Sequence, residues 1–167
     1  MWKYQSFWKR FFAGLVDVCV FIPITLLSPY LGSPHRGVLI VIIWTIINHT
    51  IYWLYSVLFH ARFGQTLGKM VARVKVLDVS EERIPTLRQA FIRDIGDVVF
   101  QVILTVYIIH LVVAGRYAKD EEFTGAPGQI VMWFCWGWFM LEIISMMTNK
   151  KRRAFHDYIA GTVVVRT

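Results

Sequence analysis

Four long apolar segments, separated by polar stretches, dominate the hydropathy pattern of this chain. They cover about residues 11–31, 37–59, 98–115 and 129–147. A helix needs around 20 apolar residues to cross a hydrocarbon core of about 30 Å, and each segment is near that length. The pattern therefore predicts an all-α membrane protein with four transmembrane helices.

The polar connection 60–97 and the polar tail 148–167 predict a small cap outside the membrane. ARVKVLD, at 72–78, alternates polar and apolar residues as a half-buried strand does, and TVVVRT in the tail is also strand-like. Thr86 is placed to cap a helix that runs into the third segment. We predict that the two strand-like pieces pair in a short β-ladder, and that the whole chain is one membrane domain.

Composition agrees with a membrane protein. Hydrophobic residues make up 56% of the 167 residues and charged residues 17%, whereas an ordinary soluble domain is about 25% charged. Cys19 and Cys135 fall within apolar segments without metal-ligand spacing, which is typical of packing residues. The sequence contains no nucleophile-elbow, zinc-protease or phosphate-loop motif. We therefore expect no enzymatic activity, no catalytic residue, no metal and no cofactor.

The distribution of the 18 lysines and arginines predicts the orientation. Fifteen lie in the N-terminal leader, the 60–97 connection and the tail, and three lie in the other two loops. By the positive-inside rule, both termini and the connection are cytoplasmic in a multi-pass protein of the cell (inner) membrane. Although the net charge is +7, the basic residues flank the spans and no nucleic-acid motif accompanies them. Anionic lipid headgroups are the expected partners, and nucleic acid is not.

The stretch RFFAGLVD, residues 10–17, carries charge into the first apolar segment. Arg10 and Asp17 are seven residues apart, so they lie almost on one helix face but about 10 Å apart along the axis. Because helical side chains lean towards the N-terminus, a direct salt bridge is not expected, and each residue should find its partner on another helix. Arg10 is also read simply as an interfacial anchor.

Three acidic or imidazole groups inside the predicted spans are candidates for an ion or proton site. An aspartate near the centre of a span is disfavoured by roughly 2.5 to 3.5 kcal/mol, so Asp17 either fixes helix packing through hydrogen bonds or has a function. His49 could relay a proton or donate to Asp17, or it could be a neutral packed histidine. Arg10 and Asp17 face one shared polar seam between the helices. Glu142 lies deep enough to join this polar seam, but an interfacial position is equally consistent.

A second set of charges is expected at the cytoplasmic mouth. Asp97 could pair with Arg93 one helical turn away, or could face the polar seam. His156 and Asp157 follow a basic run, and they fit either an amphipathic helix on lipid or a group that closes the cytoplasmic side. This geometry predicts that Arg10 lies near Asp157 or Asp97.

Three separated motifs, RFFAGLVD, GQTLGKMVARVKVLD and NKKRRAFHDYIAGTVVV, make the chain resemble the RDD family of small membrane proteins. That family is named for an arginine at the start of its first helix and two aspartates. Arg10 and Asp17 match the first two, and the resemblance assigns Asp157 as the second aspartate. It implies a multi-span inner-membrane protein proposed to transport poorly defined ligands, and some members look like cation/proton antiporters.

Two hypotheses for function follow. In the first, the chain is a small transporter or cation/proton exchanger in which Asp17, His49 and Glu142 bind the ion or proton, while Arg10, Asp97, His156 and Asp157 form the gate. In the second, it is a non-transporting scaffold or assembly factor that grips partner helices through its polar seam. Because four short spans make a thin wall, a homo-oligomer or a membrane-protein partner is expected.

Overall fold

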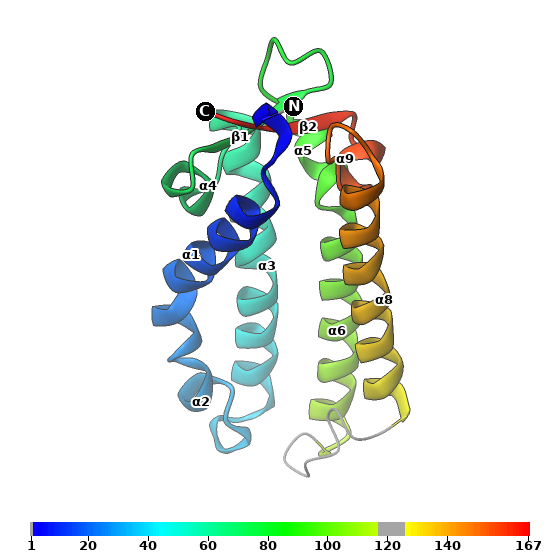
Figure 1. Cartoon of the computed structure of the whole chain (residues 1–167). Helices are drawn as coiled ribbons and strands as arrows, with labels where there is room; N and C mark the ends of the chain where they lie inside the picture. Colours follow the sequence, from blue (N-terminus) through cyan, green and yellow to red (C-terminus); the bar gives the residue numbers. More distant parts are fainter. Residues whose placement is uncertain (1, 117–125) are drawn as a thin grey trace.

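The structure, a computed structural model, describes residues 2–116 and 126–167 (Figure 1). In chain order, its elements are η1 (Trp2–Tyr4), α1 (Phe7–Thr25), α2 (Ser28–Leu31), η2 (Pro34–Arg36), α3 (Val38–Phe63), α4 (Leu67–Val71), β1 (Val74–Asp78), α5 (Leu87–Arg93), α6 (Ile95–Val113), α8 (Ala126–Thr148), α9 (Phe155–Ile159) and β2 (Thr162–Arg166). Both termini, the two strands and α4, α5 and α9 lie at one end of the long helices, and α2 lies at the other end (Figure 1). We call residues 64–94 and 149–167 the cap.

Within the described residues, three helices are long and apolar enough to cross a membrane: Val38–Phe63, Ile95–Val113 and Gly128–Thr148. They correspond to the second, third and fourth predicted spans. The first predicted span is not among them, so the expectation of four spans is not established by the helices themselves. Its helix, α1, contains three charged residues and ends at Thr25, and α2 forms a separate short helix where the apolar run was expected to continue.

The predicted boundaries of the connection also shift. The second span continues through Phe63, and the third begins at Ile95, so the connection is 64–94 and not 60–97. Helix α3 ends at Gly64, whose φ of 70° is left-handed. A Cβ at Gly64 would also lie 2.8 Å from the carbonyl oxygen of Val76, so glycine is required there both for its conformation and for its small size.

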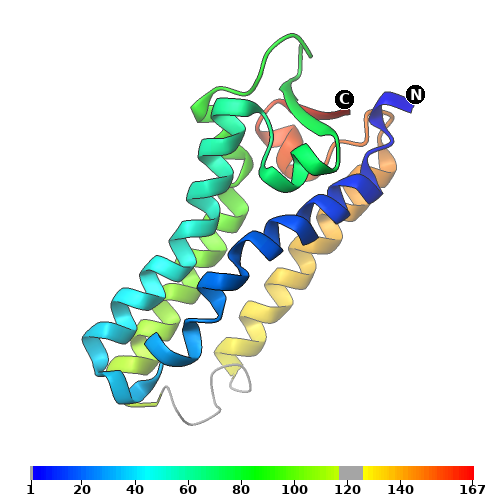
Figure 2. The same cartoon turned by 90° about the vertical axis from the view of Figure 1, so that its left-hand side faces the viewer.

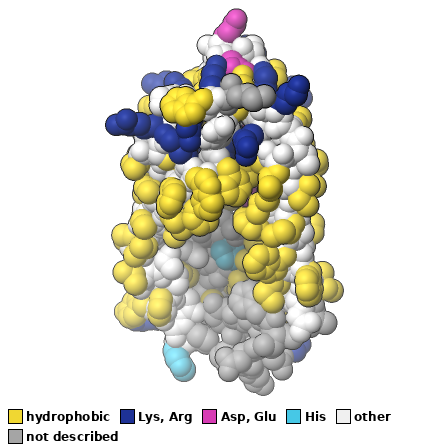
Figure 3. Space-filling model, in the orientation of Figure 1, with side chains coloured by type: hydrophobic (Ala, Val, Ile, Leu, Met, Phe, Trp, Pro, Cys, Tyr) yellow, Lys and Arg dark blue, Asp and Glu magenta, His cyan; other side chains and the backbone are white. Residues whose placement is uncertain are grey.

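The surface of the long helices is apolar and faces outward. Leu39, Val106 and Trp133 are 70%, 62% and 75% exposed. Figure 3 shows a broad band of such side chains, with lysines and arginines gathered above it at the cap end. An apolar surface of this extent suits contact with lipid. Helices can present such a surface to lipid because they satisfy their own backbone hydrogen bonds.

The predicted β-ladder is confirmed. β1 pairs with β2 in antiparallel register from Val74↔Arg166 to Asp78↔Thr162. Val74, Val76 and Val164 form its buried core. The ladder joins the connection to the tail, and so holds the cap together as one unit.

Helix α5 begins with the cap expected at Thr86, whose side chain forms a reciprocal capping box with Gln89. However, α5 ends at Arg93 and α6 begins at Ile95, so the amphipathic segment and the third span are two helices and not one. The break at Asp94 turns Arg93 into the cap.

Helix α4 packs closely against α1, as Figure 2 shows. The contact depends on Gly68, because a Cβ at this position would collide with the carbonyl oxygen of Ala13 and the carboxyl group of Asp17. The absence of a side chain at Gly68 therefore lets the backbone of α4 approach the Asp17 carboxylate.

Candidate functional site

Asp17 is buried and accepts three hydrogen bonds. The residue is only 3% exposed. Oδ1 accepts from the Tyr55 hydroxyl at 2.8 Å and from the Gly68 amide at 2.7 Å, and Oδ2 accepts from the Thr66 hydroxyl at 2.6 Å. The carboxylate therefore joins α1 to α3 and to the start of α4, and its partners lie on other elements, as the sequence predicts.

The same contacts complete the N-terminus of α4. The first amide, of Leu67, donates to the Tyr55 hydroxyl at 2.7 Å, the second to Asp17, and the third to Thr66 Oγ1. All three amides thus have side-chain acceptors, and a negative charge at a helix N-terminus is favourable. Asp17 therefore contacts the part of the cap that α4 forms.

Asp157 is completely buried at the centre of a second network. Arg10 Nη1 donates to Oδ2 at 2.8 Å, and Arg93 Nε donates to Oδ1 at 3.0 Å. The Ala154 amide and the Thr162 hydroxyl each donate to the carboxylate at 3.1 Å. Burial opposes ionisation, but the charges of Arg10 and Arg93 outweigh it and hold the pKa of Asp157 well below its usual range. The predicted proximity of Arg10 and Asp157 is confirmed.

Arg93 distributes its guanidinium among three partners and is only 5% exposed. Besides Asp157, it donates from Nη1 to His60 Nε2 at 2.8 Å and from Nη2 to His156 Nε2 at 3.0 Å. Burial alone would lower the pKa of Arg93, but the charges of Asp157 and Asp94 outweigh it and raise the pKa. Across residues 2–116 and 126–167, no ion pair joins Arg93 to Asp97, because the break at Asp94 points the guanidinium into the cap.

His60 and Lys69 belong to this network, and sequence reasoning did not identify them. His60 is fully buried, and its Nε2 lies 2.9 Å from Lys69 Nζ while its Nδ1 lies 3.2 Å from the Ser56 hydroxyl. Burial, together with the charge of Arg93, lowers the pKa of Lys69 to about 7. A lysine inside the motif GQTLGK was the available signal, but its meaning depends on His60 and Arg93, which are distant in sequence.

Glu142 contacts the tail. His156 Nδ1 lies 2.8 Å from Glu142 Oε2, and the His156 amide donates to Oε1 at 3.3 Å. Since α8 carries Glu142 and α9 carries His156, this pair links the last span to the cap. The sequence left open whether Glu142 joins the polar seam of Asp17 or lies at the interface, and the structure gives it His156 as its partner.

Two cavities meet at the Glu142–His156 pair. One, of about 500 Å³, lies between α3, α6 and α8, and the other, of about 260 Å³, lies between α1, α8 and the cap. The larger is lined by Asp97 and Gln101, and the smaller by Arg10, Asp17, Lys69 and Arg93. Four residues line both cavities: Tyr52, Phe139, Glu142 and His156.

In the described part of the chain, some buried side-chain oxygens lack a hydrogen-bond partner, and Gln101, which lines the larger cavity, carries one of them. Gln101 Oε1 and Asp94 Oδ2 are buried and have no hydrogen-bond partner within the described ranges. Such oxygens could accept from water or contact a hard cation. The part of the chain that the structure describes contains no group of three or more His, Cys, Asp or Glu placed to hold a metal ion.

His49 lies apart from both acidic groups. Its Nδ1 is 2.7 Å from the Thr105 hydroxyl, so it links α3 to α6 and does not donate to Asp17, whose three donors are other residues. The predicted ion site is thus only partly assembled: Asp17 and Glu142 line the same smaller cavity, although each has its own hydrogen-bond partners, whereas His49 contacts Thr105 and lines neither cavity. The functional roles of the three residues stay predictions.

Comparison with known proteins gives two matches. Residues 4–161 match the RDD family. The chain is also similar to an uncharacterized membrane protein, YteJ, of Bacillus subtilis (strain 168), with 32% identity over 168 residues that cover 97% of this chain and 80% of that protein. No solved structure matches the chain.

Proposed function

Since the chain belongs to the RDD family and is an integral membrane protein, we propose that it is a small transporter that exchanges a monovalent cation for a proton. The observation that carries the proposal is the Glu142–His156 pair, which lines two cavities at once. A carboxylate in direct contact with an imidazole can hold a proton or, after the proton leaves, a cation.

We propose that the protein crosses the cell (inner) membrane four times, with α1 as the additional span and the cap in the cytoplasm. Both termini lie at the same end, which requires an even number of crossings (Figure 1). Fifteen of the 18 lysines and arginines belong to the leader, the connection and the tail, so the positive-inside rule favours a cytoplasmic cap. Figure 2 shows α1 running from the cap towards α2 at the opposite end.

In the proposed cycle, the Glu142–His156 pair is the site that the proton and the cation share. A cation entering the larger cavity would be met by the carboxylates of Glu142 and Asp97 and by the side-chain oxygen of Gln101. Its charge favours loss of the proton that the Glu142–His156 pair holds, and proton binding in turn favours release of the cation. One site with two mutually exclusive occupants is sufficient for exchange.

The two arginine contacts of Asp157 supply the gate in this proposal. Arg10 on α1 and Arg93 on α5 both bind the Asp157 carboxylate, and they also line the smaller cavity on its cap side. Movement of α9 relative to α1 would open this cavity to the cytoplasm. Asp17 lines the same cavity, but three donors occupy its oxygens, so its role is to hold α4 in place.

We also propose association in the membrane, with a second copy or with another membrane protein. Only 6% of the residues in the most apolar stretch of α8 are buried within the chain. This helix forms one wall of the larger cavity, and most of its surface is therefore left uncovered. The other expected partners are lipids. The proposed exchange needs no cofactor, no nucleic acid and no enzymatic step.

The test is proton flux in proteoliposomes that hold the purified full-length protein and an internal pH dye. Pulses of sodium, lithium or potassium should drive flux by the native protein, and Glu142→Gln should abolish it. The matched control is Glu82→Gln, the same chemical change at an exposed residue of the cap. Equal flux from native protein and Glu142→Gln, or no flux from folded native protein, would refute the proposal.

The second candidate is a non-transporting scaffold, and the saturation of Asp17 favours it. The three short hydrogen bonds of Asp17 hold α1 against α3 and α4, which is a structural role that a scaffold would require. Under this hypothesis, the native protein gives no cation-dependent flux but retains a membrane-protein partner through mild detergent extraction. Retention of that partner by Glu142→Gln would then separate the scaffold from the exchanger.

A further inference from the structure

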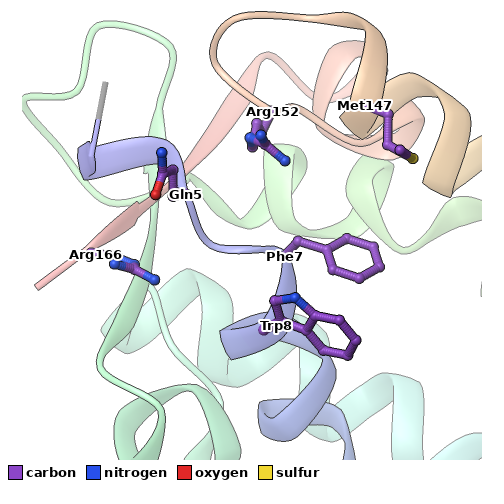
Figure 4. A pocket seen from close by; sticks show the side chains of 6 residues that line it. All are labelled: Gln5, Phe7, Trp8, Met147, Arg152 and Arg166. Atoms are coloured by element: carbon purple, nitrogen blue, oxygen red, sulfur yellow. The ribbon is translucent and has the colours of Figure 1, made fainter.

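A third cavity, of about 480 Å³, lies on the outside of the molecule where the cap meets α1 and α8. It is lined by Gln5, Phe7, Trp8, Met147, Arg152 and Arg166. Figure 4 shows that these side chains come from three separate parts of the chain, namely the N-terminal segment, the end of α8 with the loop that follows, and β2. No acidic side chain is among the residues that line it.

Both arginines of this cavity lack an anionic partner. Within the described ranges, neither Arg152 nor Arg166 forms an ion pair, and Arg166 Nε is buried without a hydrogen-bond partner. The nearby acid Glu81 is occupied, since Lys151, Lys3 and the Tyr4 hydroxyl bind it at 2.8, 2.6 and 2.7 Å. The lysines of this region are therefore neutralised by the protein, and the arginines are not.

Contacts hold the side chain of Arg166 and the backbone of Arg152. The Arg166 guanidinium lies 4.9 Å from the centre of the Trp2 ring, and β2 fixes its backbone in the ladder. The backbone carbonyl of Arg152 accepts a hydrogen bond from Arg10 Nη2 at 3.2 Å. Two guanidinium groups around one cavity are well suited to phosphate oxygens, which match their forked N–H donors.

The apolar part of the lining distinguishes a lipid from a free anion. Trp8 and Met147 are 67% and 71% exposed, and both lie where a long helix meets the cap. A free phosphate ion would gain nothing from these side chains. A phospholipid would place its phosphate at the arginines and its glycerol and first acyl carbons against Trp8, Phe7 and Met147.

We propose that this cavity binds the phosphate group of one anionic glycerophospholipid from the surrounding leaflet. Arg152 and Arg166 contact the phosphate, and Phe7, Trp8 and Met147 contact the apolar part of the same lipid. Since the cavity is built from the N-terminal segment, the loop after α8 and β2, a bound lipid would connect the leader to the tail. The site is separate from Glu142 and does not depend on the exchange reaction.

The experiment is native mass spectrometry of the full-length protein in detergent, titrated with phosphatidylglycerol or with phosphatidylcholine. The native protein should retain one phosphatidylglycerol in preference to phosphatidylcholine, and the double variant Arg152→Gln/Arg166→Gln should bind it at least about tenfold more weakly, since one charged hydrogen bond corresponds to roughly a factor of ten. The control is Arg62→Gln/Arg88→Gln, which removes the same charge from two exposed arginines outside the cavity. Equal binding by the two double variants would overturn the proposal.

Two further measurements test whether the bound phosphate belongs to a lipid or to a free ion, and whether the site exists in the native protein without any substitution. Inorganic phosphate at a concentration matching the lipid should not displace phosphatidylglycerol; full displacement would mean that the site binds a free anion and would overturn the lipid assignment. A photoactivatable phosphatidylglycerol needs no variant, and it should label the peptides holding Trp8 and Met147. Labelling only elsewhere on the chain would also overturn the proposal.

Discussion

Replacing Asp17 by alanine removes the acceptor of three hydrogen bonds at once. The Thr66 hydroxyl can rotate towards another acceptor, and the Tyr55 hydroxyl still accepts from the Leu67 amide. The Gly68 amide cannot adjust, because it is fixed at the start of α4 and buried against α1. Leaving one buried donor unsatisfied costs about 1 to 3 kcal/mol, and losing two further bonds to a charged group brings the expected loss to about 4 kcal/mol.

Asp17→Asn should cost much less. The amide oxygen can occupy the position of Oδ1 and keep the bonds from Tyr55 and Gly68. The amide nitrogen can then donate to Thr66 Oγ1, whose own hydrogen turns away. Only the charge is lost, so we expect a cost of about 1 kcal/mol, which leaves a difference of roughly 3 kcal/mol between the two variants.

The assay is the unfolding free energy of the full-length protein in mixed micelles, followed by tryptophan fluorescence during titration with denaturing detergent. Glu82→Ala is the control, since it removes an exposed carboxylate from the cap. A native-like free energy for Asp17→Ala would refute the structural role. An Asn variant as unstable as the Ala variant would show that charge, and not hydrogen-bond acceptance, is what matters.

The same Asn variant separates the two assignments of the proton-binding group. If Glu142 and His156 bind the proton, folded Asp17→Asn keeps cation-dependent proton flux in proteoliposomes. If Asp17 itself binds the proton, as the sequence-based hypothesis has it, the flux disappears while the protein stays folded. Comparison with Glu142→Gln in the same liposomes decides between them.

Three other changes have expected outcomes. Arg93→Met leaves the buried Asp157 carboxylate with one arginine fewer, so the unfolding free energy should fall by about 3 to 5 kcal/mol in detergent titration, and a loss below 1 kcal/mol would contradict this. Gly68→Ala forces a methyl group against the Ala13 carbonyl, so it should cost about 1 to 3 kcal/mol in the same titration, whereas a neutral effect would mean that α4 and α1 do not pack closely. Lys69→Met removes a group whose pKa is about 7 when folded, well below the ordinary lysine value of 10.5. Between these values, the unfolded chain binds the extra proton, so native stability gains with rising pH while the variant does not. In thermal unfolding, the native protein should therefore become more stable relative to Lys69→Met between pH 7 and pH 10. A stability difference that is the same at both pH values would argue against a buried Lys69.

Several parts of the fold were predictable because they depend on local sequence patterns. Long apolar runs predicted the three helices that could cross a membrane, and alternating residues predicted the ladder of β1 and β2. The helix cap predicted at Thr86 is confirmed, and it depends on residues only three positions apart. The pairing of Arg10 with Asp157 was also expected, since both were placed at the same membrane face by span counting.

Other predictions failed where a boundary depends on tertiary contacts. The apolar run of the first segment extends beyond α1, but the helix ends at Thr25 and restarts as α2. The third span was expected to continue the amphipathic segment, yet the chain breaks at Asp94 so that Arg93 can reach Asp157 and two histidines. The break at Asp94 takes one residue out of helical register, and such a break can be predicted only when the tertiary partners of Arg93 are known.

The sequence by itself therefore determined the membrane class, the RDD family and the ladder, and it predicted that Arg10 and Asp157 lie close together. Only the tertiary structure decided which of these charges meet. Asp17 is bound by residues 38, 49 and 51 positions away, and Glu142 by a histidine 14 positions away. Hydropathy predicts how deep a residue lies, but the rotation of each helix about its axis sets the direction of the side chain. That rotation is set by packing contacts, such as the approach of Gly68 to Ala13, between segments that are far apart in sequence.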